Sequence, residues 1–256
     1  MTPRLAVTGA TGRMGKTVLA VARERGLDIA FAVNRDADGE HVEGVPVRPS
    51  AEFEALLDEE RPDAVVDFTG PEATVAYAGA CATYGVPLVT GTTGFSEADV
   101  AALEEAGTAV PILVGANFSR GVQALLDAVE SAVADLPEYD VELLETHHNG
   151  KRDAPSGTAK VLLDRIEGAR EGATERVHGR EGEAPREAGE IGVHARRAGD
   201  VTGEHEVLLA GNHESLELTH RAGSRSVFAE GALDAAAWLA EQPADYYRFE
   251  TIASQL

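Results

Sequence analysis

The stretch from residue 145 to residue 158, ETHHNGKRDAPSGT, gathers side chains that could transfer protons and bind an anion. His147 and His148 are adjacent, and Lys151 follows them after two residues. An imidazolium or an ammonium group can donate a proton to a reacting substrate. Residues 155–158, PSGT, precede a helical pattern, and a helix start offers free N–H groups to a carboxylate. The stretch therefore predicts proton transfer to a small dicarboxylate substrate.

A metal site is the alternative interpretation of this stretch, with Glu145, His147, His148 and Asp153 as ligands. The pattern ends a strand at ETHH, where neighbouring side chains point to opposite faces, so the two histidines would chelate poorly. The helical His-x-x-x-His spacing is absent. We therefore expect no metal. Other histidines are interpreted as surface or satisfied core residues, namely His41, His178, His194, His205 and His213.

A glycine turn near the N-terminus indicates a nucleotide. The segment LAVTGATGRMGKTVLAVARERG predicts a strand, a turn and a helix, with Gly9, Gly12 and Gly15 in the turn. Such a turn lets the backbone approach a pyrophosphate, and the helix N-terminus then stabilises the charge. A tight turn without a ligand is the alternative, but the strand and helix on either side favour the dinucleotide.

The end of the next strand, DIAFAVN, bears on the choice of cofactor. An acidic residue at this position usually holds the ribose 2′-hydroxyl of NAD. This chain has Asn34 and Arg35 there, followed by Asp36. The guanidinium can bind a 2′-phosphate, and asparagine does not repel it. The pattern favours NADPH, while Asp36 leaves NADH open.

The elements that follow predict a parallel sheet. Apolar strands alternate with helical patterns as far as about residue 118, which is typical of βαβ units in an α/β fold. Ligands of such sheets bind at the carboxyl ends of the strands. These ends carry Phe68 and Thr69, the GTTG sequence at 91–94 and the GANF sequence at 115–118. We expect them to line one crevice.

The second half has a different pattern. Residues 118–137 predict a long amphipathic helix, and four later segments alternate apolar and polar residues. These segments, at 139–147, 191–199, 203–211 and 214–223, predict a mixed or antiparallel sheet. Residues 166–189 have few large apolar side chains and are interpreted as an exposed loop. A helix over residues 224–242 could then close the nucleotide-binding domain.

The composition restricts the partners and the setting. A formal charge of −22 argues against nucleic acid and anionic membranes. Only three of the 22 basic residues are lysine, which suggests a surface adapted to high salt; GC-biased codon usage is the alternative. The one cysteine, Cys81, lies in an apolar helical stretch and is expected to be buried. With no leader or membrane-spanning run evident, we expect a soluble cytoplasmic protein.

Several motifs together resemble one known family. They are GATGRMG, DFTGPE, GTTGF, ANFSRGV, ETHHNGKRDAPSGTA and the C-terminal block GEHEV…THRAGSRSVFAEGALDAAAWL. In this order they resemble the 4-hydroxy-tetrahydrodipicolinate reductase family, formerly dihydrodipicolinate reductase, of the diaminopimelate route to lysine. The resemblance covers nearly the whole chain.

The resemblance implies a fold and an assembly. A Rossmann-type parallel-sheet domain would comprise residues 1–118 and 223–256, with the C-terminal helix completing it. An inserted α+β domain with a mixed sheet, residues 119–222, would bind the substrate and form a homotetramer. The implied reaction is the reduction of (2S,4S)-4-hydroxy-2,3,4,5-tetrahydrodipicolinate by NADPH or NADH, with loss of water.

The resemblance also implies roles for individual residues. His147 and Lys151 would be the catalytic proton donors. The substrate would be bound by His148, Ser156, Gly157, Thr158 and Thr93. The cofactor would be bound by Gly9, Ala10, Thr11, Gly12, Arg13, Met14, Asn34, Arg35, Gly91, Thr92, Thr93, Gly115, Ala116, Asn117 and Phe118. The chain departs from many members at Asn34, where they have an acidic residue, and in HHNGK, which lacks extra basic residues.

Three other interpretations start from parts of the same sequence. A short-chain dehydrogenase needs a Tyr-x-x-x-Lys pair, and no tyrosine here has a lysine four positions later. A non-catalytic nucleotide sensor would not need His147, Lys151 and the anion-binding turn together. A reductase of another cyclic imino acid remains open, because substrate choice depends on the shape of the pocket.

Overall fold

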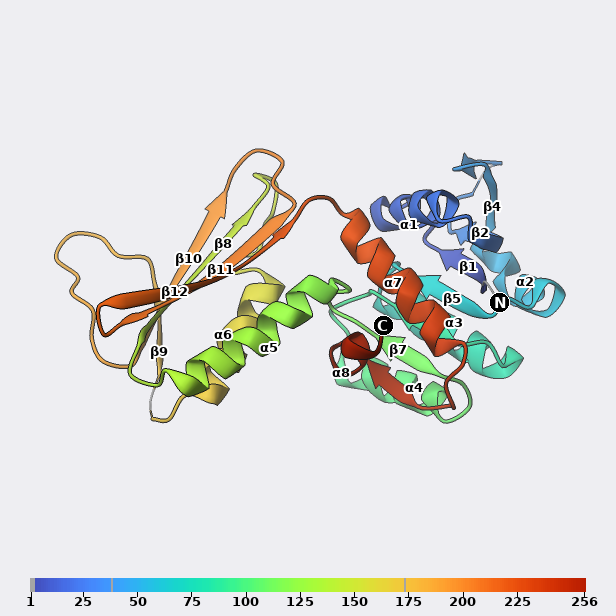
Figure 1. Cartoon of the computed structure of the whole chain (residues 1–256). Coiled ribbons are helices and arrows are strands. Elements are labelled where there is room, and N and C mark those ends of the chain that lie inside the picture. The colour runs from blue at the N-terminus through green and yellow to red at the C-terminus, as the bar shows by residue number, and fades with distance from the viewer. Residues whose placement is uncertain (1–2, 38, 173) are drawn as a thin grey trace. The chain divides into compact units, whose positions relative to one another are not determined.

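The computed structural model describes residues 3–37, 39–172 and 174–256 (Figure 1). The chain divides into two compact units: Met1–Ser119 with Arg225–Leu256, and Arg120–Ser224. The first contains a parallel-rich sheet and the second a mixed sheet, which confirms the predicted α/β class. The predicted roles of the two domains stay predictions. No helix in the described ranges is long and apolar enough to cross a bilayer.

The first unit is built on one sheet with the strand order β13-β7-β6-β5-β1-β2-β4-β3. Neighbouring strands are parallel, except that β3 runs antiparallel to β4. The strands are β1 (Arg4–Thr8), β2 (Asp28–Asn34), β3 (His41–Val42), β4 (Val45–Pro49), β5 (Ala64–Asp67), β6 (Leu88–Thr90), β7 (Ile112–Val114) and β13 (Tyr246–Arg248).

Helices cover both faces of this sheet, as its near-continuous apolar strands require. They are α1 (Arg13–Glu24), α2 (Phe53–Glu60), α3 (Pro71–Tyr84), α4 (Glu97–Gly107), α7 (Ser226–Leu239) and α8 (Phe249–Ile252), with short 3-10 turns at Ser50–Glu52 and Ala253–Gln255. One apolar cluster joins α1, α7 and α8 to alternate sheet residues such as Leu5 and Val7. A second joins α2, α3 and α4 to the opposite face. Figure 1 shows α1 and α7 side by side.

Two expectations for this unit are confirmed. The C-terminal helix α7 does complete the first unit, because Leu233, Ala236 and Leu239 belong to its core. Cys81 has no exposed surface and is not part of a disulfide, and burial raises the pKa of its thiol. It is therefore a core side chain, as predicted from its apolar helical surroundings.

The second unit contains the mixed sheet β12-β11-β8-β10-β9. Its strands are β8 (Asp140–His147), β9 (Glu175–His178), β10 (Glu190–Arg197), β11 (Gly203–Gly211) and β12 (Glu214–Ala222). β8, β9 and β10 are parallel, and β11 is antiparallel to both of its neighbours. Helices α5 (Arg120–Asp135) and α6 (Gly157–Ala169) pack on one face through a cluster that includes Leu126, Leu143 and Leu163.

The interpretation of residues 166–189 as one exposed loop was wrong. α6 continues to Ala169, and β9 pairs in parallel with β10. β9 reads ERVH and lies at the edge of the sheet, so it carries no apolar alternation that would reveal a strand. The short strands β3, β4 and β13 were not predicted either.

Candidate functional site

The glycine turn between β1 and α1 has the geometry of a phosphate cradle. Gly9 has φ +66°, a left-handed conformation that glycine adopts without strain. A Cβ at Gly15 would lie 2.1 Å from the Gly9 carbonyl oxygen, so only glycine allows the helix to begin against the turn. Gly12 caps α1 without a side-chain hydrogen bond, which leaves the first N–H groups open to a ligand. These residues fit a pyrophosphate.

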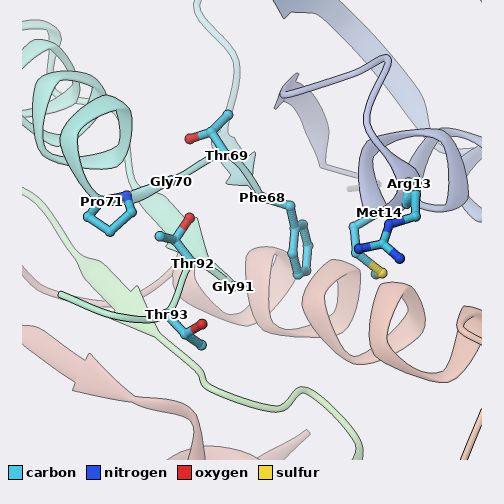
Figure 2. A pocket seen from close by; sticks show the side chains of 9 residues that line it. All are labelled: Arg13, Met14, Phe68, Thr69, Gly70, Pro71, Gly91, Thr92 and Thr93. Atoms are coloured by element: carbon cyan, nitrogen blue, oxygen red, sulfur yellow. The ribbon is translucent and has the colours of Figure 1, made fainter. Parts of the chain in front are cut away.

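A pocket of about 340 Å³ lies beside this turn (Figure 2). It is lined by Arg13, Met14, Phe68, Thr69, Gly70, Pro71, Gly91, Thr92 and Thr93. The Phe68 ring packs on Gly91, where a Cβ would lie 2.0 Å from the Phe68 Cε1 atom. Five predicted cofactor residues, from the glycine turn and from the end of β6, are therefore brought together here with the residues that follow β5.

Two other predicted cofactor residues are core residues. Ala10 has no exposed surface, and Phe118 is 1% exposed. The Phe118 ring packs on Phe68 and Phe249, with centroids 6.0 Å and 4.7 Å apart. Both residues therefore shape the loops around the pocket and do not face a ligand in this unit.

The remaining predicted cofactor residues are not part of the lining of this pocket. In the glycine turn, Thr11 is half-buried and Gly12 is exposed. Gly115 follows β7 and donates from its N–H to the Thr90 carbonyl over 3.0 Å, and the Asn117 side chain accepts from the Ser119 N–H over 2.8 Å. Ala116 lies between them in the same loop. Asn34 ends β2, and Arg35 is exposed just beyond it.

In the second unit, Glu145 holds His147. Glu145 is completely buried, and its Oε2 atom lies 2.5 Å from Nδ1 of His147. Arg197 donates to both carboxylate oxygens over 2.7 and 2.8 Å. The arginine is in place because β10 pairs with β8 in a register that sets Arg197 opposite His147. Nδ1 faces Glu145, so the other ring nitrogen, Nε2, is the one left for a substrate.

The environment of this pair sets its charges. Burial lowers the pKa of His147 below its ordinary value, although the hydrogen bond and charge of Glu145 oppose the shift. Burial alone would raise the pKa of Glu145, but Arg197 and His147 outweigh it, and the net shift is downward. Glu145 is therefore an anion that supports the imidazolium form of a buried histidine.

Lys151 and His148 lie in the loop after β8. The Lys151 ammonium is 2.8 Å from Asp153, and this contact lowers the pKa of the Asp153 carboxyl. The strand ends at His147, so His148 lies beyond it. The separation of the two histidines onto opposite faces therefore stays a prediction, because strand alternation applies only as far as His147. The Asn149 N–H donates to the Gly199 carbonyl over 3.1 Å, which fixes this loop against the turn after β10.

The predicted anion-binding helix start is present at α6. Ser156 is its N-cap, and the hydroxyl accepts from the Ala159 N–H over 3.2 Å. Ser156 is 2% exposed and its hydroxyl is engaged within the protein, so it positions the turn and cannot reach a substrate with that group. Gly157 is exposed and Thr158 half-buried at the first turn of the helix. These two residues remain the candidates for binding a carboxylate.

His205 is a core histidine, as interpreted from the sequence, but only one of its two ring nitrogens has a hydrogen-bond partner among the described residues. It is 4% exposed, and its Nε2 atom lies 3.1 Å from the Ser156 hydroxyl. Its Nδ1 atom has no hydrogen-bond partner among the described residues. The ring meets that of His147 edge to face, with centroids 5.3 Å apart. Burial lowers the pKa of His205 to about 4, so it is a neutral wall beside His147.

Sequence patterns missed Glu145, Arg197 and His205 because their roles depend on strand register. His205 lies directly opposite Glu145 in the β11–β8 pair. One signal for this network was available in the sequence, the basic pair Arg196 and Arg197 in the predicted strand 191–199. Within the described ranges no group of three His, Cys, Asp or Glu side chains could hold a metal ion.

Comparison with known proteins gives two family matches. The model described as dihydrodipicolinate reductase, N-terminus, matches residues 3–118, and the model described as dihydrodipicolinate reductase, C-terminus, matches residues 121–252. The chain is 55% identical to a 4-hydroxy-tetrahydrodipicolinate reductase from Natronomonas pharaonis, over 95% of this chain and 97% of the relative. It is 51% identical to that of Haloarcula marismortui, over 96% and 97%.

Solved structures agree with these matches. A dipicolinate-bound dihydrodipicolinate reductase from Paenisporosarcina sp. TG-14 is similar with a TM-score of 0.80 and 25% identity, over 98% of this chain and all of that one. An amine dehydrogenase from Mycobacterium smegmatis, at 15% identity and a TM-score of 0.64, shares the fold alone.

Proposed function

The chain belongs to the 4-hydroxy-tetrahydrodipicolinate reductase family, also called dihydrodipicolinate reductase, and from this premise we propose the reaction it catalyses. It reduces (2S,4S)-4-hydroxy-2,3,4,5-tetrahydrodipicolinate to (S)-2,3,4,5-tetrahydrodipicolinate, with loss of water, in lysine biosynthesis through diaminopimelate. It is an oxidoreductase that uses a nicotinamide cofactor, which supplies hydride when bound.

One observation carries this proposal more than any other. Buried Glu145, paired with half-buried Arg197, holds His147 close to the capped start of α6 and to the Lys151 loop. The Ser156 N–H donates to Glu145 over 3.1 Å, which joins the proton-donating side and the anion-binding side in one network. A small anionic substrate that must be protonated needs both.

The proposed roles follow from this arrangement. Protonated His147 and Lys151 supply the proton for the carbon next to the reduced one. His148, Gly157 and Thr158 hold the carboxylates. Because the protein carries a formal charge of −22, this local concentration of positive groups also attracts a substrate that the rest of the surface repels.

We propose NADPH as the preferred cofactor, with NADH also accepted. Arg35 is exposed beside Asn34 at the end of β2, where a 2′-phosphate can meet a guanidinium. Arg35→Ala should weaken the binding of NADPH about tenfold while changing that of NADH little, as measured by fluorescence titration. Equal losses for both cofactors would remove the 2′-phosphate argument.

We also propose that the protein works in the cytoplasm as a homotetramer assembled through the second unit. Half-buried Leu144 and Leu208 lie on neighbouring strands of its sheet, outside the cluster that packs on α5 and α6. A second copy would cover such a surface. Light scattering coupled to gel filtration at high salt gives the assembly directly, and a monomer at micromolar concentration would contradict it.

The deciding experiment is a coupled assay at high potassium chloride. A separate synthase makes the substrate in place from pyruvate and aspartate semialdehyde, and oxidation of NADPH or NADH is followed by absorbance. Oxidation should depend on the synthase. Lys151→Ala should retain cofactor binding and lose most of the turnover, because the ammonium is a proton donor; Lys160→Ala, an exposed lysine in α6, is the control. Cofactor binding without oxidation would favour another cyclic imino acid or a nucleotide sensor.

A further inference from the structure

Asp67, at the end of β5, is a fully buried carboxylate that is surrounded by hydroxyl groups. Its Oδ1 atom accepts from Thr8 and from Thr69, each over 2.6 Å. Its Oδ2 atom accepts from Thr74 and Thr90 over 2.7 Å and from Thr92 over 3.1 Å. All five partners are hydroxyl groups, each of which can donate to a carboxylate ion.

This charge has no counter-ion. Among the described residues, no arginine, lysine or histidine nitrogen lies within 4 Å of Asp67. Burying a carboxylate without a cation is unfavourable even when hydrogen bonds satisfy it. A purely structural clamp would be cheaper as a neutral asparagine or as an apolar side chain, so the charge calls for an explanation.

Asp67 is hydrogen-bonded to two of the residues that line the pocket shown in Figure 2. Thr69 and Thr92 line that pocket, and their hydroxyl groups donate to the carboxylate. Only the Thr69 and Thr92 side chains therefore separate the Asp67 carboxylate from a ligand in the pocket. At such a distance, inside a protein, the interaction of two charges is far less screened than in water.

The strand order indicates which half of the cofactor this is. The glycine turn follows β1, with β2 on one side of it and β5 and β6 on the other. The two nucleosides of a dinucleotide lie on either side of its pyrophosphate. Asn34 and Arg35, at the end of β2, mark the adenosine side. The pocket beside β5 and β6 is then on the nicotinamide side.

We propose that Asp67 is a fixed negative charge behind the nicotinamide pocket, and that it favours the oxidised, positively charged ring over the neutral reduced ring. Loss of hydride to the substrate leaves one positive charge on the ring, so a carboxylate at this place stabilises the product of hydride transfer relative to the reactant. The role of Asp67 is one of positioning and electrostatics, since the threonines separate it from the ring. The inference rests on the cofactor placement proposed above, but not on the identity of the substrate.

The test compares oxidised and reduced cofactors, which differ by that one charge. Asp67→Asn keeps the size of the side chain and removes the charge. Dissociation constants are measured by calorimetry for NADP⁺ and NADPH, and for NAD⁺ and NADH, without substrate and at high potassium chloride. The ratio of the oxidised to the reduced dissociation constant should rise about tenfold in the variant, or about 1.4 kcal/mol. Thr8→Val is the matched control: it removes one hydroxyl donor, keeps the charge and leaves the pocket lining intact, so the ratio should not change.

Two outcomes would overturn the inference. An unchanged ratio, with or without equal weakening of both forms, would remove the electrostatic role and leave Asp67 as a structural clamp. A similar change in Thr8→Val would assign the effect to loosened packing. Asp67→Asn could fail to fold, because its amide would meet five hydroxyl donors. In that case Asp67→Ser is used in the same measurement, since the smaller side chain leaves room for water among the threonines. These binding ratios stand even if the proposed substrate is wrong, because no turnover enters them.

Discussion

At the scale of single residues, the network around His147 depends on one charge, that of Glu145. Arg197 fixes this carboxylate from the neighbouring strand, and His147 is bonded to it through Nδ1. The arrangement resembles other carboxylate–histidine pairs, in which the acid sets the tautomer and supports the imidazolium. It explains how a half-buried histidine can still be protonated when it has to donate.

Glu145→Gln should move the pH dependence of the reaction. The amide can still bond to Nδ1 but carries no charge, so burial lowers the pKa of His147 further. Protonated His147 is the donor, and the alkaline fall of kcat/KM should therefore move by about one unit to lower pH. The pH profile measured against Glu142→Gln provides the check, because Glu142 bonds to His194 in the same sheet. Identical pH profiles for the two variants would show that the charge of Glu145 does not set the pKa of the proton donor.

His205 makes a prediction about stability. Its pKa is about 4 in the folded protein, whereas an exposed histidine titrates near 6.5. Between these values the unfolded chain binds the proton and the folded protein does not. The free energy of unfolding therefore falls as the pH drops through this window, by up to roughly 3 kcal/mol.

Replacement by glutamine should reduce this acid sensitivity. Urea unfolding at pH 7 and at pH 4.5 measures the loss for the parent protein and for His205→Gln, and the loss should be smaller in the variant. His178→Gln is the control, because His178 is exposed in β9 and should leave the loss unchanged. An equal loss of unfolding free energy in all three proteins would mean that groups other than His205 cause the loss of stability at low pH.

At the scale of elements, two helical glycines differ in what surrounds them. A Cβ at Gly231 in α7 would lie 1.8 Å from the Phe118 carbonyl oxygen, whereas a Cβ at Gly79 in α3 would meet nothing within 4 Å. Gly231→Ala should destabilise the protein by about 2 kcal/mol, because a backbone atom must shift. Gly79→Ala should stabilise it by about 0.5–1 kcal/mol through helix propensity. The melting temperatures of the two variants are compared with that of the parent protein. Equal shifts would show that α7 can move away from the Phe118 carbonyl with little loss of stability.

Local patterns predicted most of the elements that build the site. The glycine turn, the buried strands of the first unit and the capped start of α6 each carry their signal within about 20 residues of sequence. The residues that the predictions missed lie together only through pairing. Arg197 meets Glu145 through the β8–β10 register, and Thr8, Thr74 and Thr90 meet Asp67 from three separate elements. Periodicity contains no information on register between distant strands, so these contacts could not be predicted.

At the scale of the whole molecule, charge should control stability. The 44 acidic residues outnumber the 22 basic ones, and the relatives from Natronomonas pharaonis and Haloarcula marismortui are halophilic archaeal proteins, in keeping with a salt-adapted surface. Salt reduces the Debye length from about 30 Å at 0.01 M to about 3 Å at 1 M, which screens the repulsion. The melting temperature should therefore fall when potassium chloride is diluted.

A melt in sucrose at the same osmolality is the control for this prediction. Sucrose stabilises folded proteins because it is excluded from their surface, but it does not screen charge, so it should restore less of the lost stability than potassium chloride does. A melting temperature independent of salt would favour codon usage as the reason for the arginine-rich, lysine-poor composition.

The division of the first unit between the two ends of the chain has a consequence for synthesis on the ribosome. Residues 120–224 are continuous and contain the whole second unit, so this unit can fold as soon as it emerges. The first unit has to wait for its last 32 residues, because α7 covers one face of its sheet and β13 pairs with the edge of β7. A nascent chain therefore carries an unpaired edge strand and an open apolar face for the time needed to translate the second unit. During that interval the N-terminal half depends on chaperones, or on its own strong negative charge, to avoid aggregation.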